Sequence, residues 1–311
     1  RPIQMSREVT VWAPATVANL NVGFDALGCA LSCPGERMIV RTTETPGEVR
    51  IRSVHGASLD LNADRNIASV AAKSLLQAMG NPCGLELELF KDIKPGSGIG
   101  SSAASASGAV VAVNELLNAG LRPEELLPFA LDGEQLASGA RHADNVAPAL
   151  LGGLVLCPPE GAPLSIPMPF DWHLVILHPQ IEIRTADARG ALPEVVPLSD
   201  AAAQSAWMGA FVAACHEGDS ERALFSLEDL LVTPHRQGFI PHFEQMKQAA
   251  LRAGARAGGI SGSGPSTFWI AKDAQDAQSV GDSLEVCMTE NAVPYHIHHA
   301  QIAPQGAHIV P

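Results

Sequence analysis

The stretch Ile93-Lys-Pro-Gly-Ser-Gly-Ile-Gly-Ser-Ser-Ala-Ala104 is where the fold of this chain can first be predicted. It puts three glycines within five residues, although a glycine inside a helix or strand costs about 0.5–1 kcal/mol relative to alanine. Leucines alternate with glutamates over residues 85–89 just before it, which is typical of a half-buried strand. Small residues over 101–119 follow it and predict a helix that ends at Gly120. We therefore expect a strand, a glycine loop whose backbone must approach something closely, and a helix.

A strand, a glycine loop and a helix N-terminus together form an arrangement that binds phosphate. The N–H groups of the loop converge, and the helix adds unsatisfied donors and about half a positive charge. The Walker pattern, the dinucleotide-binding Gly-x-Gly-x-x-Gly spacing and the protein-kinase motifs do not describe this stretch, whose spacing is Gly-x-Gly-x-Gly. Taken alone, the stretch is equally well explained as a flexible turn before an alanine-rich helix.

The composition bounds the class of protein. The chain has 311 residues, of which 46% are hydrophobic and 17% charged, a length that favours two domains over one. A net charge of −13 without a basic stripe argues against nucleic acid and anionic membranes as partners. Six cysteines without a Cys-x-x-Cys pair predict reduced thiols. No signal peptide is apparent and the longest apolar stretch, 147–157, is too short to span a bilayer, so we expect a cytoplasmic protein.

The other predicted elements indicate an α+β protein. Strands are expected over 9–12, 38–43, 49–54, 150–156, 173–178, 267–271 and 295–301, and helices over 67–80, 123–140, 200–217, 221–231, 241–257 and 274–290. A turn is expected after residue 140. The proline-rich region 158–171 is the best candidate boundary between domains 1–160 and 161–311, although it can equally be a long loop within one domain.

Two further stretches lie near the ends of the chain. They are Ala13-Pro-Ala-Thr-Val-Ala-Asn-Leu-Asn-Val-Gly-Phe-Asp25 and Gly258-Gly-Ile-Ser-Gly-Ser-Gly-Pro-Ser266. With the central glycine stretch they form an ordered set of three motifs, which resembles that of the GHMP small-molecule kinases. The first stretch is similar to the version found in the homoserine kinases of that superfamily. Asn21 and Val22 stand where the family usually has Gly-Pro, and Lys94 stands where the central motif usually opens with Pro.

The resemblance implies a fold and an activity. The fold is an N-terminal domain similar to domain 2 of ribosomal protein S5, followed by a ferredoxin-like C-terminal domain, with ATP and substrate meeting between them. The implied reaction transfers the γ-phosphoryl group of ATP, with Mg²⁺, to the hydroxyl of L-homoserine, as in threonine biosynthesis. Family analogy suggests a homodimer. A GHMP kinase for another small alcohol and a non-catalytic relative that binds nucleotide remain as alternatives.

The resemblance assigns the ATP phosphates to the central motif and the metal to two oxygen ligands. Ser102 begins the predicted helix, and Glu134 would be a carboxylate on a largely apolar helix face, although from the sequence alone a partly exposed helix-edge residue is the better explanation. The family places a metal-binding glutamate eleven residues before the asparagine of His-x-Asp-Asn, which favours Glu134 as a Mg²⁺ ligand beside Ser102. The expected ATP-binding residues are Lys94, Pro95, Gly96, Ser97, Gly98, Ile99, Gly100, Ser101, Ser102, Ala103 and Ala104.

The segment His142-Ala-Asp-Asn145 would by itself most often be a local hydrogen-bonded turn. In the homoserine kinases it faces the substrate hydroxyl, so His142 and Asn145 are expected at the substrate, with Asp144 structural. The resemblance names no general base, because positioning and charge stabilisation can drive phosphoryl transfer. Glu134, Asn145 and Thr185 are the residues that we expect at the catalytic centre.

An amino-acid acceptor makes two chemical demands, a guanidinium for its carboxylate and an anion with amide oxygens for its ammonium. Arg189 and Arg236 match the family's carboxylate-binding arginines, and Asn19 and Asp25 match the residues that hold the ammonium. Thr185 matches a hydroxyl near the transferred phosphate. A single arginine is more commonly a solvated surface charge, so the prediction rests on the complete set. The second glycine stretch, 258–266, is expected to support the first and to close over the substrate.

Overall fold

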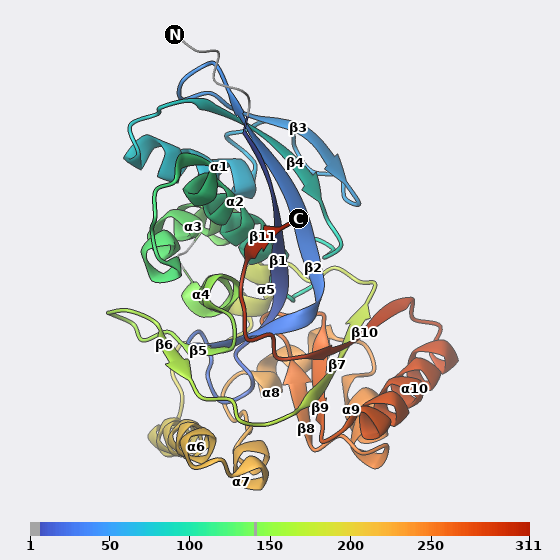
Figure 1. Ribbon diagram of the computed structural model, residues 1–311. Helices are drawn as coiled ribbons and strands as arrows, with labels where there is room; N and C mark the ends of the chain where they lie inside the picture. Colours follow the sequence, from blue (N-terminus) through green and yellow to red (C-terminus); the bar gives the residue numbers. More distant parts are fainter. Residues whose placement is uncertain (1–6, 140–141) are drawn as a thin grey trace.

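The strand that precedes the glycine loop lies inside a seven-stranded sheet (Figure 1). The computed structural model describes residues 7–139 and 142–311, apart from the side chains of residues 137, 138 and 185. The main path of the sheet runs in the order β11 (His308–Val310), β1 (Glu8–Ala18), β2 (Leu27–Thr43), β4 (Gly84–Phe90) and β3 (Val49–His55). The short strand β5 (Leu154–Leu156) pairs with β2 and with β6 (Leu164–Ile166). Only β3 and β4 are parallel among the described pairs of this sheet.

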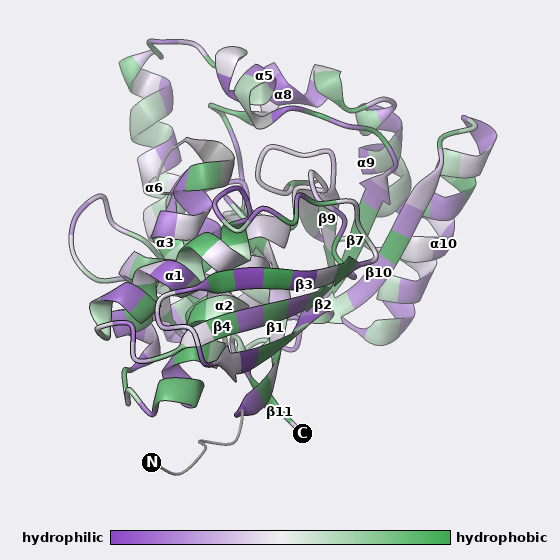
Figure 2. Cartoon of the chain, turned by 90° about the horizontal axis from the view of Figure 1, so that it is seen from above, coloured by the Kyte–Doolittle hydropathy of each residue, from purple (hydrophilic) through white to green (hydrophobic). Residues whose placement is uncertain are grey.

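Helices cover one face of this sheet (Figures 1 and 2). They are α1 (Ile67–Ala78), α2 (Ser101–Leu117), α3 (Pro123–Ser138) and α4 (Ala143–Leu151). The alternation in β4 shows why, because its leucines are buried toward the helices while Glu86 and Glu88 lie on the other face and bond to Arg50 and Arg41. Figure 2 shows this banding along the strands.

A second, antiparallel sheet lies below the first in Figure 1. Its strands are, in order, β10 (Tyr295–Gln301), β7 (His173–Pro179), β9 (Thr267–Ala271) and β8 (Ala257–Ile260). Helices α9 (Phe243–Arg252) and α10 (Ala274–Glu290) pack on it, and α6 (Leu198–Glu217) and α7 (Ser220–Phe225) form a separate pair. The short helices α5 (Thr185–Gly190) and α8 (Thr233–Arg236) carry the two arginines expected at the substrate, and a 3₁₀ turn (Gln237–Phe239) follows α8.

The described residues form three apolar cores, and one of them joins the two sheets. The first lies between the large sheet and helices α1 to α4, around Leu75 and Leu87, and the third lies under α9 and α10, around Trp269. The second core joins the two halves, because Leu31 of β2 and Phe268 of β9 belong to the same buried cluster. A site between the sheets is therefore held on both sides by packed side chains.

The α+β prediction is confirmed, but several elements differ from the sequence prediction, among them β2, which begins at Leu27 and not at residue 38. Strand β1 continues through Pro14 because the ladder with β2 shifts register between Pro14 and Thr16. The turn expected after residue 140 is the start of helix α4, so the strand predicted over 150–156 is only β5. Helix α7 ends at Phe225, because the Asp229 carboxylate accepts bonds from three following N–H groups and starts a new turn. Helix α9 covers only 243–252 of the predicted 241–257.

The division at residue 160 stays a prediction. Strands β6 and β11 lie after that position and nevertheless join the first sheet. Within the described residues, no helix is both long and apolar enough to cross a membrane. All six cysteines are free thiols, as the spacing predicts.

Candidate active site

The central glycine loop runs from the end of β4 to the first turn of α2, with Gly96, Gly98 and Gly100 all at positive φ. Two of these positions are closed to any side chain. A Cβ on Gly98 would lie 2.6 Å from the carbonyl oxygen of Gly264, and a Cβ on Gly100 would lie 2.0 Å from Oγ1 of Thr16. The close approach that the glycines predict is thus made to the other two motifs, while the space beside Gly96 is open.

A cavity of about 370 Å³ lies in front of this loop, and residues from all three motifs line it. From the expected ATP-binding set, Pro95, Gly96, Ser97, Gly98, Gly100, Ser101 and Ser102 line the cavity. Four others do not. Ile99, Ala103 and Ala104 are buried in the core, and the Lys94 ammonium donates to Oε1 of Gln180 at 2.9 Å. The phosphate-binding assignment therefore rests on the backbone and hydroxyls of 95–102.

A buried ion pair behind the loop is a feature that the sequence analysis missed. Lys91, at the end of β4, pairs with Glu36 of β2, and both are almost fully buried. The Lys91 ammonium also donates to the Ser101 carbonyl at 3.2 Å and to Oγ of Ser105 at 2.7 Å. Each charged residue continues the buried-face alternation of its strand, and a charge at such a position was the available signal. Lys91 lines the cavity and holds the first turn of α2.

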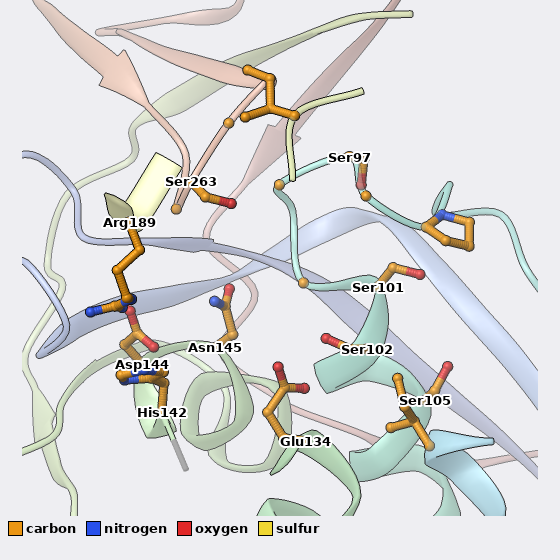
Figure 3. Close-up of a pocket in the computed structure, with 18 of the residues that line it drawn as sticks. Ser97, Ser101, Ser102, Ser105, Glu134, His142, Asp144, Asn145, Arg189 and Ser263 are labelled. Atoms are coloured by element: carbon orange, nitrogen blue, oxygen red, sulfur yellow. The ribbon is translucent and has the colours of Figure 1, made fainter. Parts of the chain in front are cut away.

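Ser102 of α2 and Glu134 of α3 lie next to each other in the wall of the cavity (Figure 3). Burial raises the pKa of Glu134 to about 7; its hydrogen bond with the Ser102 hydroxyl opposes this rise, and the charge of Asp144 adds to it. A nearby cation would favour the ionised form of this carboxyl.

The N-terminal turn of α4 brings His142, Asp144 and Asn145 to the same cavity (Figure 3). Oδ1 of Asn145 accepts a 2.7 Å hydrogen bond from the Thr16 hydroxyl. Asp144 is buried, and burial together with the charge of Asp25 raises its pKa to about 7. The cluster is therefore the beginning of a helix and not an isolated turn.

The residues expected to bind the acceptor line one part of the cavity, called here the acceptor side: Asn19, Asp25, His142, Arg189 and Arg236. Oppositely charged side chains are in contact there. The Arg189 guanidinium donates two 3.0 Å hydrogen bonds to the Asp25 carboxylate, and these bonds raise the pKa of Arg189. Asn19 accepts from the Asp25 N–H through Oδ1. His142 lies farther off, with Nδ1 3.9 Å from Oδ2 of Asp25. These are four of the five residues expected at the acceptor, and the structure brings them together around Asp25.

Arg236, the fifth, is 3% exposed and lies on the same side. Its Nε donates to the Ala188 carbonyl at 3.0 Å and its Nη1 to the Gly262 carbonyl at 3.1 Å. The guanidinium carbons of Arg189 and Arg236 both lie over the Phe24 ring, at 5.6 and 5.3 Å from its centroid, which are cation–π distances. Phe24 was not singled out from the sequence, although it lies inside the first motif.

Asn21, which departs from the family pattern, lies in the tight turn of the first motif. Asn21 adopts φ +63, a conformation that asparagine tolerates, and donates to the carbonyls of Leu227 and Gly258. The first motif therefore keeps a tight turn without glycine at this position.

Thr185 is the first residue of α5. Its side chain is not among those that the structure describes, so the role predicted for its hydroxyl stays a prediction.

The cavity, with a glycine loop on one side and paired charges on the other, fits a small-molecule kinase. Family models for the GHMP kinases agree, since the N-terminal domain model matches residues 66–153 and the C-terminal model matches 211–287. The chain is 45% identical over 264 residues to the homoserine kinase of Xanthomonas campestris pv. campestris (strain B100), which covers 84% of this chain and 81% of the relative.

A second relative is the homoserine kinase of Xylella fastidiosa (strain 9a5c), 40% identical over 286 residues, with 91% of this chain and 88% of the relative covered. The crystal structure of homoserine kinase from Cytophaga hutchinsonii superposes with a TM-score of 0.94 at 38% identity, covering 99% of this chain and 98% of that one. The chain therefore belongs to the homoserine kinase family of the GHMP kinases. The predicted two-domain GHMP fold is confirmed.

Proposed function

We propose that this protein transfers the γ-phosphoryl group of ATP to the side-chain hydroxyl of L-homoserine. The products are O-phospho-L-homoserine and ADP, so the reaction is the phosphorylation step of threonine biosynthesis. One observation carries the proposal: the paired charges of Arg189 and Asp25, with Arg236 beside them, line the same cavity as the glycine loop. A cytoplasmic location and a homodimer belong to the same proposal as expectations.

The acceptor is recognised by charge at both ends of its backbone. Arg236 uses two of its five N–H donors on carbonyls, which leaves donors on a buried guanidinium for a carboxylate. Asp25 and Asn19 supply a carboxylate and an amide oxygen for an ammonium group. Arg189, already paired with Asp25, would exchange part of that pairing for the substrate. A sugar or mevalonate offers no matching ammonium group.

The nucleotide end is built for charge and not for covalent chemistry. The backbone of 95–102 and the N-terminus of α2 present donors toward the cavity, where a phosphate chain is favoured. In the transfer, the bond from the γ-phosphorus to its bridging oxygen breaks, a bond to the acceptor oxygen forms, and the hydroxyl proton is released to solvent. Lys91 keeps the first turn of α2 in place while charge moves toward the leaving ADP.

Mg²⁺ fits the donors at one side of the cavity. Ser102 and Glu134 supply a hydroxyl and a carboxylate, which are the hard oxygen ligands that this ion accepts, and Mg²⁺ usually leaves its other positions to phosphates and water. The raised pKa of Glu134 agrees with this role, because a nearby cation would restore the ionised form. When bound, Mg²⁺ would neutralise charge on the phosphate oxygens.

Orientation of the acceptor hydroxyl falls to α4. Because Oδ1 of Asn145 accepts from Thr16, the amide nitrogen of Asn145 is the group left to donate toward an acceptor oxygen. This amide cannot take a proton, so Asn145 orients the hydroxyl and is not a base. His142 lines the same space at the start of α4. Thr185 is proposed to contact the transferred phosphate, on the family resemblance alone.

ADP release in a coupled assay tests the proposal, with Mg-ATP and a panel of L-homoserine, D-homoserine, L-threonine, mevalonate and galactose. Turnover confined to L-homoserine is the expected result. Turnover only with another alcohol would keep the kinase and refute the acceptor roles of Arg189, Arg236 and Asp25. Bound ATP without turnover on any acceptor would favour a non-catalytic nucleotide-binding protein.

A further inference from the structure

The third motif connects the acceptor side of the cavity to the glycine loop through adjacent residues. Two acceptor-side groups meet at one atom, because Nδ2 of Asn19 and Nη1 of Arg236 both donate to the Gly262 carbonyl at 3.1 Å. The Gly262 N–H in turn donates to the Ala18 carbonyl at 3.2 Å. Gly262 is therefore fixed by the same side chains that are proposed to hold the acceptor.

Ser261, the residue before Gly262, contacts the central glycine loop. Its side chain is fully buried, and its hydroxyl donates a 2.7 Å hydrogen bond to the Gly98 carbonyl of the central loop. Two further contacts hold the loops together. The Ser266 N–H donates to the Ser97 carbonyl at 3.1 Å, and the backbone of Gly264 lies where a Cβ of Gly98 would be. The residue that bonds to Asn19 and Arg236 and the residue that bonds to the phosphate loop are thus adjacent in the chain.

We propose that Ser261 is a positioning residue that couples acceptor binding to nucleotide binding. The inference rests on the proposed function, since it takes L-homoserine and ATP as the two ligands. A carboxylate bound at Arg236 immobilises Gly262, and the Ser261 hydroxyl then holds the Gly98 carbonyl and orders the loop before the phosphates arrive. The conformational entropy of the loop is then lost once for both ligands, so each ligand strengthens the binding of the other by the same factor.

The test measures that factor by calorimetry on the full-length protein. The dissociation constant of L-homoserine is determined with and without a saturating non-hydrolysable ATP analogue and Mg²⁺, in wild type and in Ser261→Ala. The wild type is expected to bind L-homoserine at least about tenfold more tightly in the presence of the analogue. Ser261→Ala is expected to lose about fivefold of this gain, as removal of one net hydrogen bond predicts, while each ligand alone binds within about twofold of wild type.

Ser266→Ala is the matched control. Ser266 lies in the same loop, is equally buried, and has a hydroxyl that meets no hydrogen-bond partner within the described residues. This variant is expected to keep the wild-type factor. A factor unchanged in Ser261→Ala, equal losses in both variants, or a wild-type factor of one would each overturn the proposal.

Hydrogen exchange on the wild type covers the case in which Ser261→Ala does not fold. L-homoserine alone should slow the exchange of backbone amides in 96–101, and unchanged exchange would overturn the coupling. Failure of the proposed function looks different, because the wild type would then not bind L-homoserine at all in either titration. That result removes the proposed substrate as well as the coupling.

Discussion

Replacement of Arg236 by leucine separates the two halves of the proposed site. Arg236 is 3% exposed, and two of its guanidinium N–H groups are bound to the Ala188 and Gly262 carbonyls. In the proposed site, two of the remaining N–H groups donate to the carboxylate of the acceptor. A hydrogen bond to a charged group contributes about 1.5–3 kcal/mol, so loss of two of them costs about 3–6 kcal/mol. At about 1.4 kcal/mol for each tenfold change, Arg236→Leu should raise the KM for L-homoserine by at least about a hundredfold.

The assay compares this effect with nucleotide binding measured in the absence of acceptor. Because Arg236 lies on the acceptor side, the Kd for ATP should change by less than about threefold. Arg236→Lys keeps the charge and loses the fork, so it should fall between wild type and leucine. Arg222→Leu is the surface control, since that arginine is exposed and pairs with Glu217. Equal effects of Arg236→Leu on both ligands, in a variant that melts like wild type, would remove Arg236 from the acceptor site.

Three other predictions concern the charged groups around the loop. Glu134→Ala should lower kcat at least about a hundredfold at ordinary Mg²⁺ with an unchanged circular dichroism spectrum, and near-normal turnover would refute its metal role. Lys91→Met should lower the free energy of unfolding by about 3–5 kcal/mol in urea because it leaves Glu36 charged and buried, whereas the double change with Glu36→Gln should recover most of the loss; additive losses would contradict a coupled pair. The pKa values of Glu134 and Asp144 are raised to about 7 in the folded protein, so their contribution to stability is present below their unfolded pKa values and is lost as pH rises through about 7. Thermal melts of the ligand-free protein should show this fall between pH 5 and 8, and it should be smaller in Glu134→Gln; an equal fall in that variant would exclude Glu134 as its source.

Local sequence patterns predicted the elements whose side chains have one clear period. The leucine–glutamate alternation of β4 predicted a strand, because one face of β4 is buried and the other is partly exposed. The small residues of α2 predicted the helix that follows the phosphate loop, and most of them are buried. The apolar run at 147–157 was wrongly read as a strand over 150–156. A short apolar run does not distinguish a buried helix from a buried strand, and here it contains both, separated by Gly152 and Gly153.

The roles that depend on long-range contacts could not be read from local pattern. Pro14 was expected to end a strand, and only the irregular pairing with β2 allows β1 to continue through it. The partnership of Lys91 with Glu36 joins two strands that are far apart in sequence, so one side chain gives no sign of the other. The acceptor residues were predicted through the family resemblance, and the structure adds that Asp25 and Arg189 form a bidentate pair.

The position of the transferred phosphorus on the product shows which group of the acceptor faces the glycine loop, its hydroxyl or its carboxylate. In the proposed site the acceptor carboxylate binds to Arg236, which lines the cavity, and the acceptor hydroxyl faces the glycine loop. After incubation with Mg-ATP and L-homoserine, phosphorus NMR should show a phosphate ester coupled to the side-chain methylene protons and stable to hydroxylamine. A hydroxylamine-labile acyl phosphate would mean that the carboxylate faces the loop, and would contradict the proposed arrangement of the site.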